Sequence, residues 1–116
     1  MSSIVIYERD DLMYSLLREW LSAAGYTVSE SSAPVELVVA SFSTSKYENE
    51  MLIRGARRIH PQAAIIALSS QARSGLSSDG AAATALGVER VMAKPLTRGE
   101  LLAAVESIIG PPNRTR

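Results

Sequence analysis

Several short apolar runs of this sequence end in polar side chains of the kinds that bind ions and accept or transfer groups. These side chains are Glu8, Arg9, Asp10, Ser41, Ser69, Ser70 and Lys94. Carboxylates can ligate a divalent cation, a lysine can bind an anionic group, and a hydroxyl can donate and accept hydrogen bonds. If the apolar runs are parallel strands of one sheet, their carboxyl ends lie at a common edge. The sequence therefore predicts one polar site at that edge.

The strands are predicted from apolar runs rich in Val or Ile, since strands covered on both faces are continuously apolar. Four such runs are Ser3–Tyr7, Glu36–Ser41, Ala64–Ser69 and Val88–Met92, and a weaker, more polar one is Tyr26–Glu30. Helical spacing of apolar residues predicts helices over Asp11–Ala24, Lys46–Ile59, Ser78–Leu86 and Arg98–Ile109. This alternation predicts an α/β fold with a doubly wound, mostly parallel five-stranded sheet.

Helix starts are marked by residues that can cap them. Ser45 with Glu48, and Thr97 with Glu100, have the spacing of a capping box. Asp10 or Asp11 can cap the first helix. These signals fix where the helices begin relative to the strand ends that carry the polar groups.

The helix between the second and third strands is missing, because only Ser31–Val35 separates them. A parallel crossover normally takes a dozen or more residues. A link of this length reaches about 20 Å, at ~3.3–3.6 Å per residue. Either the second strand is very short, or it does not lie in its usual place in the parallel sheet. Both outcomes should uncover apolar surface or a sheet edge, so we expect a homodimer or a docked protein at that face.

Size and charge limit the other possibilities. The 116 residues, 47% of them hydrophobic, suit one domain, expected at 1–110 with a flexible tail at 111–116. Zero net charge gives no reason to expect a nucleic acid or a membrane as partner. The chain has no Cys, no signal-peptide pattern and no apolar stretch long enough for a membrane span, so we expect a cytoplasmic protein. Without a Gly-rich phosphate loop, or a nucleophile with a base and an orienting group, we expect no enzyme.

Over nearly its whole length the chain resembles the receiver domain of two-component response regulators, the CheY-like fold. The likeness lies in Ser3–Asp10, Leu16–Val28, His60–Ser70, Gly87–Leu96 and Glu100–Val105. The turn formed by Lys94 and Pro95 is its most specific part. The resemblance implies a site in which acids bind Mg²⁺, an Asp at the end of the third strand accepts phosphate, and the Lys contacts the phosphoryl group.

Carried over residue by residue, the resemblance assigns a role to each position. Those assigned positions are Glu8, Arg9 and Asp10 for the acids, Ser41 for the phosphoacceptor, Ser69 and Val91 for the switch residues, and Lys94 with Pro95 for the phosphate-binding turn. A cis bond is expected before Pro95. Serine is a poor acceptor from phosphohistidine, and Val91 lacks the usual aromatic ring. Arg9 would repel Mg²⁺ and could instead pair with Glu8 or Asp10.

We therefore predict a stand-alone pseudo-receiver of a two-component or phosphorelay system, with no cofactor, no metal and no catalytic residue. It would act by contact with a histidine kinase, another regulator or a second copy of itself. Two alternatives stay open: a receiver regulated by unconventional phosphorylation, and, less favoured, a small-molecule-binding flavodoxin-like domain.

Each candidate also has a purely structural interpretation. Glu8 and Asp10 could cap the first helix, and Lys94 could form a salt bridge with either of them. Ser41 could be a neutral strand-end residue. His60, which ends a helix before Pro61, is expected to be a C-cap cation.

Overall fold

The computed structural model describes residues 3–29, 35–70 and 87–112 of the chain. Strands and helices alternate along it in the order β1 (Ser3–Tyr7), α1 (Asp11–Ala23), β2 (Thr27–Val28), β3 (Leu37–Ser41), α2 (Lys46–Ile59), β4 (Ala64–Ser69), β5 (Arg90–Ala93) and α4 (Arg98–Ile109). The predicted helix at Ser78–Leu86 and most of the predicted tail lie outside the described residues. None of the described helices has the length and apolar character needed to cross a membrane.

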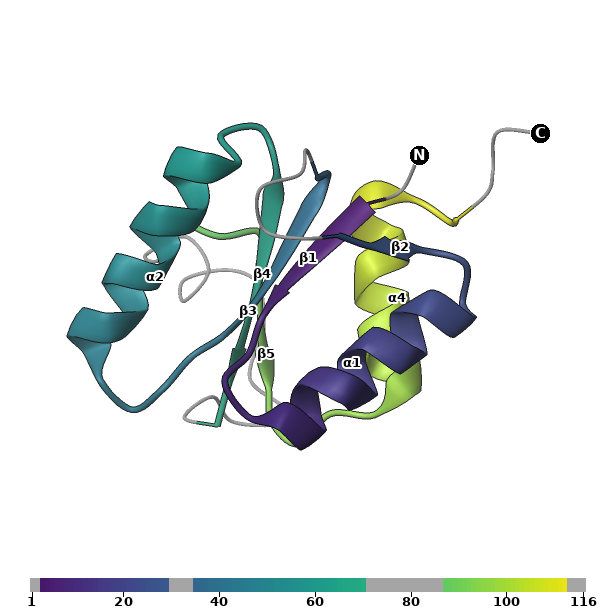
Figure 1. The fold of residues 1–116 in the computed structure, drawn as a ribbon, viewed down its shortest axis with the longest axis horizontal. Coiled ribbons are helices and arrows are strands. Elements are labelled where there is room, and N and C mark those ends of the chain that lie inside the picture. The colour runs from purple at the N-terminus through teal and green to yellow at the C-terminus, as the bar shows by residue number, and fades with distance from the viewer. Residues whose placement is uncertain (1–2, 30–34, 71–86, 113–116) are drawn as a thin grey trace.

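The strands form one parallel sheet in the order β2-β1-β3-β4-β5, with helices on both faces. Figure 1 shows α1 and α4 together on one face and α2 on the other. The predicted fold class, a doubly wound α/β sheet of five strands, is confirmed. In this arrangement all strand carboxyl ends point to the same edge.

Alternation along the strands supplies a separate core for each face. In β1, Ile4 and Ile6 pack towards α1 and α4, while Val5 packs on the α2 side. The first core holds Leu17 of α1 and Leu101 of α4, each fully buried. Burying one such side chain contributes about 1.5–3 kcal/mol, so these cores fix the strands whose ends carry the site.

The caps hold the helices at the predicted starts. Thr97 and Glu100 form the complete capping box, with each side chain bonded to the other's backbone N–H. Ser45 accepts a hydrogen bond from the N–H of Glu48, at 3.2 Å, but the second half of this predicted box is absent: the Ser45 N–H donates to Ser43 Oγ instead. The Glu48 carboxylate is thereby left to other partners.

The short link between β2 and β3 is sufficient because β2 itself is very short, which is one of the two predicted alternatives. Thr27 and Val28 pair with Ser3 and Ile4, at the very start of β1. The chain returns to the same place, since Leu37 also pairs with Ile4. The link therefore need not travel back along β1.

The expected uncovering of apolar strand surface is wrong. Val5 and Val38, on the α2 side of the sheet, are 3% and 0% exposed. Exposed large apolar side chains lie instead on the helices of the described chain: they are Leu12, Leu16, Tyr47, Met51 and Ile59. Among the described residues, the large apolar side chains available to a contact surface thus lie on α1 and α2.

The last strand is displaced from its predicted position and begins at Arg90 rather than Val88. Val88 is nevertheless buried in the core. The Glu89 side chain accepts a hydrogen bond from the N–H of Ile65 at 2.8 Å. A side-chain carboxylate therefore bonds to this N–H of β4, where a backbone carbonyl of a neighbouring strand would otherwise do so.

Candidate functional site

The strand register places the predicted polar residues at one edge. Tyr7 pairs with Ala40, so Glu8 follows β1 at the level where Ser41 ends β3. Ser69 pairs with Ala93, so Lys94 follows β5 at the same edge. Three segments that are far apart in the sequence therefore meet, as the strand pattern predicted.

Lys94 joins Glu8 and Ser41 by hydrogen bonds. The Lys94 ammonium donates to Glu8 Oε1 at 3.3 Å and also to Ser41 Oγ. We call these three residues the Lys94 cluster.

The Glu8 carboxylate is more enclosed than the Lys94 side chain. Its side chain is 6% exposed, against 23% for Lys94. Burial acts to raise the pKa of Glu8. The N–H of Asp10, the Ser41 side chain and the Lys94 charge lower it by more than burial raises it, so the pKa lies below its ordinary value. Glu8 is therefore ionised at neutral pH, and its bond to Lys94 is a true ion pair. The predicted salt bridge of Lys94 is confirmed.

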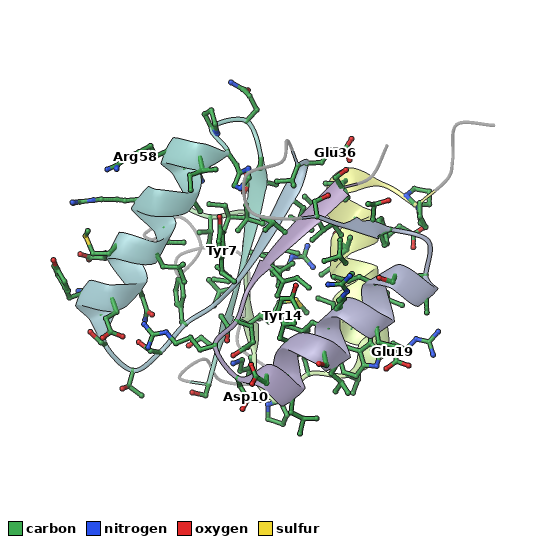
Figure 2. The ribbon with its side chains drawn as sticks, viewed as in Figure 1. Tyr7, Asp10, Tyr14, Glu19, Glu36 and Arg58 are labelled. Carbon is green, nitrogen blue, oxygen red and sulfur yellow. The ribbon has the colours of Figure 1, made fainter. Side chains whose placement is uncertain are left out.

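Asp10 stabilises the start of α1. Its carboxylate accepts the N–H of Met13 at 2.8 Å, and its own N–H donates to Glu8 Oε2 at 3.0 Å. Figure 2 shows Asp10 at the first turn of this helix, at the edge of the sheet where the strands end. The structural interpretation of Asp10 as a cap is confirmed.

Arg9 points out of the cluster, and the expectation that it would pair with Glu8 or Asp10 is wrong. Its guanidinium lies 3.6 Å from Glu48 Oε1, with side chains 83% and 49% exposed. Glu8 and Asp10 already have other partners, which leaves the Glu48 carboxylate as the available anion. An exposed pair of this kind contributes about 0–1 kcal/mol.

The remaining predicted positions surround the Lys94 cluster. Ser69 is buried, and its carbonyl accepts the N–H of Lys94 at 3.1 Å. Val91 is part of the core on the α2 side of the sheet. The bond before Pro95 is cis, as expected.

His60 is the C-cap of α2, as predicted, and it is 5% exposed. Its Nε2 has no hydrogen-bond partner among the described residues.

An open pocket of about 550 Å³ adjoins the Lys94 cluster, between the ends of β1 and β3 and the first turns of α2. Its α2 side is formed by residues that the sequence analysis did not assign to the site, among them Ser43, Glu48 and Asn49. Asn49 closes the loop before α2: its Oδ1 accepts the Ser43 N–H at 2.8 Å and its Nδ2 donates to the Ser43 carbonyl at 3.0 Å. The signal that could have identified this loop is the run of hydroxyl residues at Ser43–Ser45, one residue after the end of β3.

Tyr7 also lines this pocket, on the α2 side of the sheet (Figure 2). Its hydroxyl is buried and has no hydrogen-bond partner within the described ranges. Burial raises the pKa of Tyr7. The pocket wall thus combines the aromatic side chain of Tyr7 with the charged side chains at the carboxyl edge of the sheet.

The site does not fit the Mg²⁺ ion that a receiver would hold. Glu8 is bonded to Lys94 and to the Asp10 N–H, and Asp10 is bonded to the Met13 N–H. Within the part of the chain that the structure describes, no three His, Cys, Asp or Glu residues form a group that could hold a metal. A divalent cation needs several free oxygen ligands, and here the carboxylates are already committed.

Several solved structures of similar shape are response regulators. A CheY-like receiver domain protein from Methanospirillum hungatei JF-1 matches with a TM-score of 0.74 and 16% identity, over 92% of both chains. A response regulator from Thermotoga maritima matches with a TM-score of 0.74 and 19% identity, over 94% of this chain and 98% of the other.

A response regulator from Burkholderia pseudomallei, solved with a phosphorylated aspartic acid, a calcium ion and citrate, has a TM-score of 0.70 and 19% identity, over 90% of this chain and 66% of the other. No family model and no curated protein matches the sequence. Identities this low establish the likeness of fold alone.

Proposed function

Because the chain folds as a CheY-like receiver domain, we propose that it is a non-enzymatic signalling module that acts by protein contact without aspartate phosphorylation. Its partner on this proposal is a histidine kinase, another regulator or a second copy of the chain, in the cytoplasm. The fold supports a signalling role, and the residues at the carboxyl edge of the sheet support the absence of phosphotransfer.

The observation that carries the proposal is that Lys94 is bonded to Glu8 and to Ser41, the residue at the tip of β3. Forming an acyl phosphate needs a carboxylate at that tip, with a cation to neutralise the phosphoryl oxygens. A hydroxyl stands there instead, and the lysine that would contact the phosphoryl group is already paired with the Glu8 carboxylate.

The carboxylates nearby do not replace the missing one. Glu8 is ion-paired and almost fully enclosed, Asp10 caps α1, and Glu48 pairs with Arg9. Each is therefore committed to holding the structure. The Lys94 cluster joins the ends of β1, β3 and β5 through side chains of the chain itself.

The test is to rebuild the missing site with the double substitution Ser41→Asp and Arg9→Asp. If Ser41 and Arg9 occupy the positions assigned to them, the double variant should bind Mg²⁺ in isothermal titration calorimetry and the natural chain should not. Ser41→Asp alone is the matched control, and it should bind more weakly because the Arg9 charge remains. Mg²⁺ binding by the natural chain, or none by the double variant, would contradict the proposal.

A further inference from the structure

The outer face of α2 combines apolar and basic side chains. Tyr47 and Met51, one turn apart on the helix, are 70% and 44% exposed. Arg54 and Arg58 continue the same row, and both are exposed. Figure 2 shows Arg58 pointing away from the sheet. Because Tyr, Met and Arg are enriched in interfaces between proteins, this row has the composition of a contact surface.

The charge of this face is basic. Glu48 already forms an ion pair with its own chain. The other exposed charged residues of α2 are three basic ones and one acidic one: Lys46, Arg54, Arg58 and Glu50. Glu50 lies one helical turn from both Lys46 and Arg54, so it balances at most one of the three positive charges. The face therefore keeps a positive charge and complements an acidic partner.

A glycine interrupts the same face. Gly55 lies within α2, four residues after Met51 and four before Ile59, which is 52% exposed. A Cβ atom added to Gly55 would have no atom within 4 Å, so packing of the chain does not require a glycine there. Glycine inside a helix is less stable than alanine. Its place between two exposed apolar side chains leaves a notch, at which a partner can approach the helix backbone closely.

We propose that this face of α2 binds an acidic segment of another protein. A large apolar side chain of that segment lies over Gly55, between Met51 and Ile59. Its carboxylates pair with Arg54 and Arg58, and an arginine can hold a carboxylate through two parallel hydrogen bonds. The apolar contact at the notch excludes water from beside these ion pairs.

A nucleic acid or an anionic membrane complements this face less well. Both present many negative charges side by side, and Glu50 lies among the basic residues, where it would oppose such an array. A protein segment can place an uncharged residue opposite Glu50. It also supplies the apolar side chain that the notch at Gly55 accommodates.

The inference rests on the proposed function, because it names the chemistry of a partner for a module that acts by contact. The Mg²⁺ test concerns Ser41 and Arg9 at the carboxyl edge of the sheet, whereas the partner binds the outer face of α2. Failure of the inference would therefore leave the Mg²⁺ result unchanged.

Short random peptides displayed on phage are the probe. Selection on the natural chain should enrich peptides that combine Asp or Glu with a large apolar residue, and their affinity should fall as salt rises. In fluorescence polarisation, the double variant Arg54→Glu and Arg58→Glu should bind these peptides at least about tenfold more weakly. The matched control is Arg18→Glu with Arg98→Glu, which makes the same change in net charge at exposed positions of α1 and α4, on the other face of the sheet. It should change the affinity by less than about twofold.

Three results of this selection would overturn the inference. They are no enrichment, enriched peptides without an excess of Asp and Glu, and equal losses of affinity in the two double variants. A chain that binds phosphatidylserine vesicles or a short DNA duplex, but none of the peptides, would also overturn it.

Gly55→Gln tests the notch separately from the charge. Glutamine favours the helix more than glycine does, so the urea midpoint should rise by about 0.5 M. The longer side chain fills the notch, so peptide binding should weaken at least about tenfold. Gly99→Gln, at a helical glycine of α4 on the other face of the sheet, is the matched control and should leave peptide binding unchanged. Equal peptide binding by Gly55→Gln and by the natural chain would overturn the inference.

Discussion

Replacing Lys94 with methionine removes the cation of the Lys94 cluster and keeps a side chain of similar length. The partner carboxylate of Glu8 is 6% exposed and the Lys94 side chain 23%. The pair therefore lies between an exposed ion pair, worth about 0–1 kcal/mol, and a buried one, whose disruption costs about 3–5 kcal/mol. Glu8 would keep its bond to the Asp10 N–H. We expect the free energy of unfolding to fall by about 2 kcal/mol at neutral pH.

The pH dependence separates this electrostatic loss from a loss of packing. In the natural chain burial acts to raise the pKa of Glu8, and the Asp10 N–H, Ser41 and Lys94 outweigh it and lower the pKa. The Glu8 carboxylate therefore stabilises the fold above its unfolded-state pKa, and this contribution is lost as pH falls through the lower folded-state pKa. Without Lys94 the burial remains, so Glu8 protonates at a higher pH and its unpaired charge disappears. The difference between variant and natural chain should thus shrink from pH 7 to about pH 4.

The assay is urea unfolding followed by circular dichroism at both pH values. Lys46→Met is the matched control, because Lys46 is the only other lysine and lies exposed at the start of α2. It should change the free energy of unfolding by less than about 0.5 kcal/mol. Equal losses for the two variants, or a loss at Lys94 that does not change with pH, would refute the reasoning.

Three further substitutions test the elements that position the site. Thr97→Ala should lower the free energy of unfolding by about 1 kcal/mol, because it removes the cap of α4; an unchanged urea midpoint would count against the capping box. His60→Leu should raise the free energy of unfolding by about 1 kcal/mol, because it removes a buried nitrogen without a partner among the described residues, and a lower thermal midpoint would show that His60 has a stabilising bond. Leu101→Ala should cost about 2–5 kcal/mol by urea unfolding, whereas Leu12→Ala, at an exposed position, should cost less than about 0.5 kcal/mol; similar losses for both would contradict the assignment of the core.

Much of the fold could be predicted from the sequence, because apolar spacing and capping residues act locally. β1, β4, α2 and α4 have the predicted bounds. The strand β5 differs because its start is set by pairing with β4, where Ile66 pairs with Arg90, and not by its own apolar run. β2 is shorter than its apolar run for the same kind of reason: the next strand must return to the start of β1 over a short link.

The candidate site was predictable to the level of which strand ends meet, and not to the level of which side chains bond. Parallel pairing alone brings Glu8, Ser41 and Lys94 to one edge. The direction of Arg9 depends on Glu48, whose carboxylate is available only because the predicted capping box at Ser45 is half formed. Competition of this kind among neighbouring side chains is decided by three-dimensional geometry, which the spacing of residues does not contain.

The central claim is that the hydroxyl of Ser41, at the tip of β3, has replaced the group that receives phosphate. Intact-protein mass spectrometry of the natural chain, after incubation with acetyl phosphate and Mg²⁺, tests it most directly. We predict that the mass stays unchanged. One phosphoryl group bound per chain, on Ser41 or on a nearby carboxylate, would contradict the account.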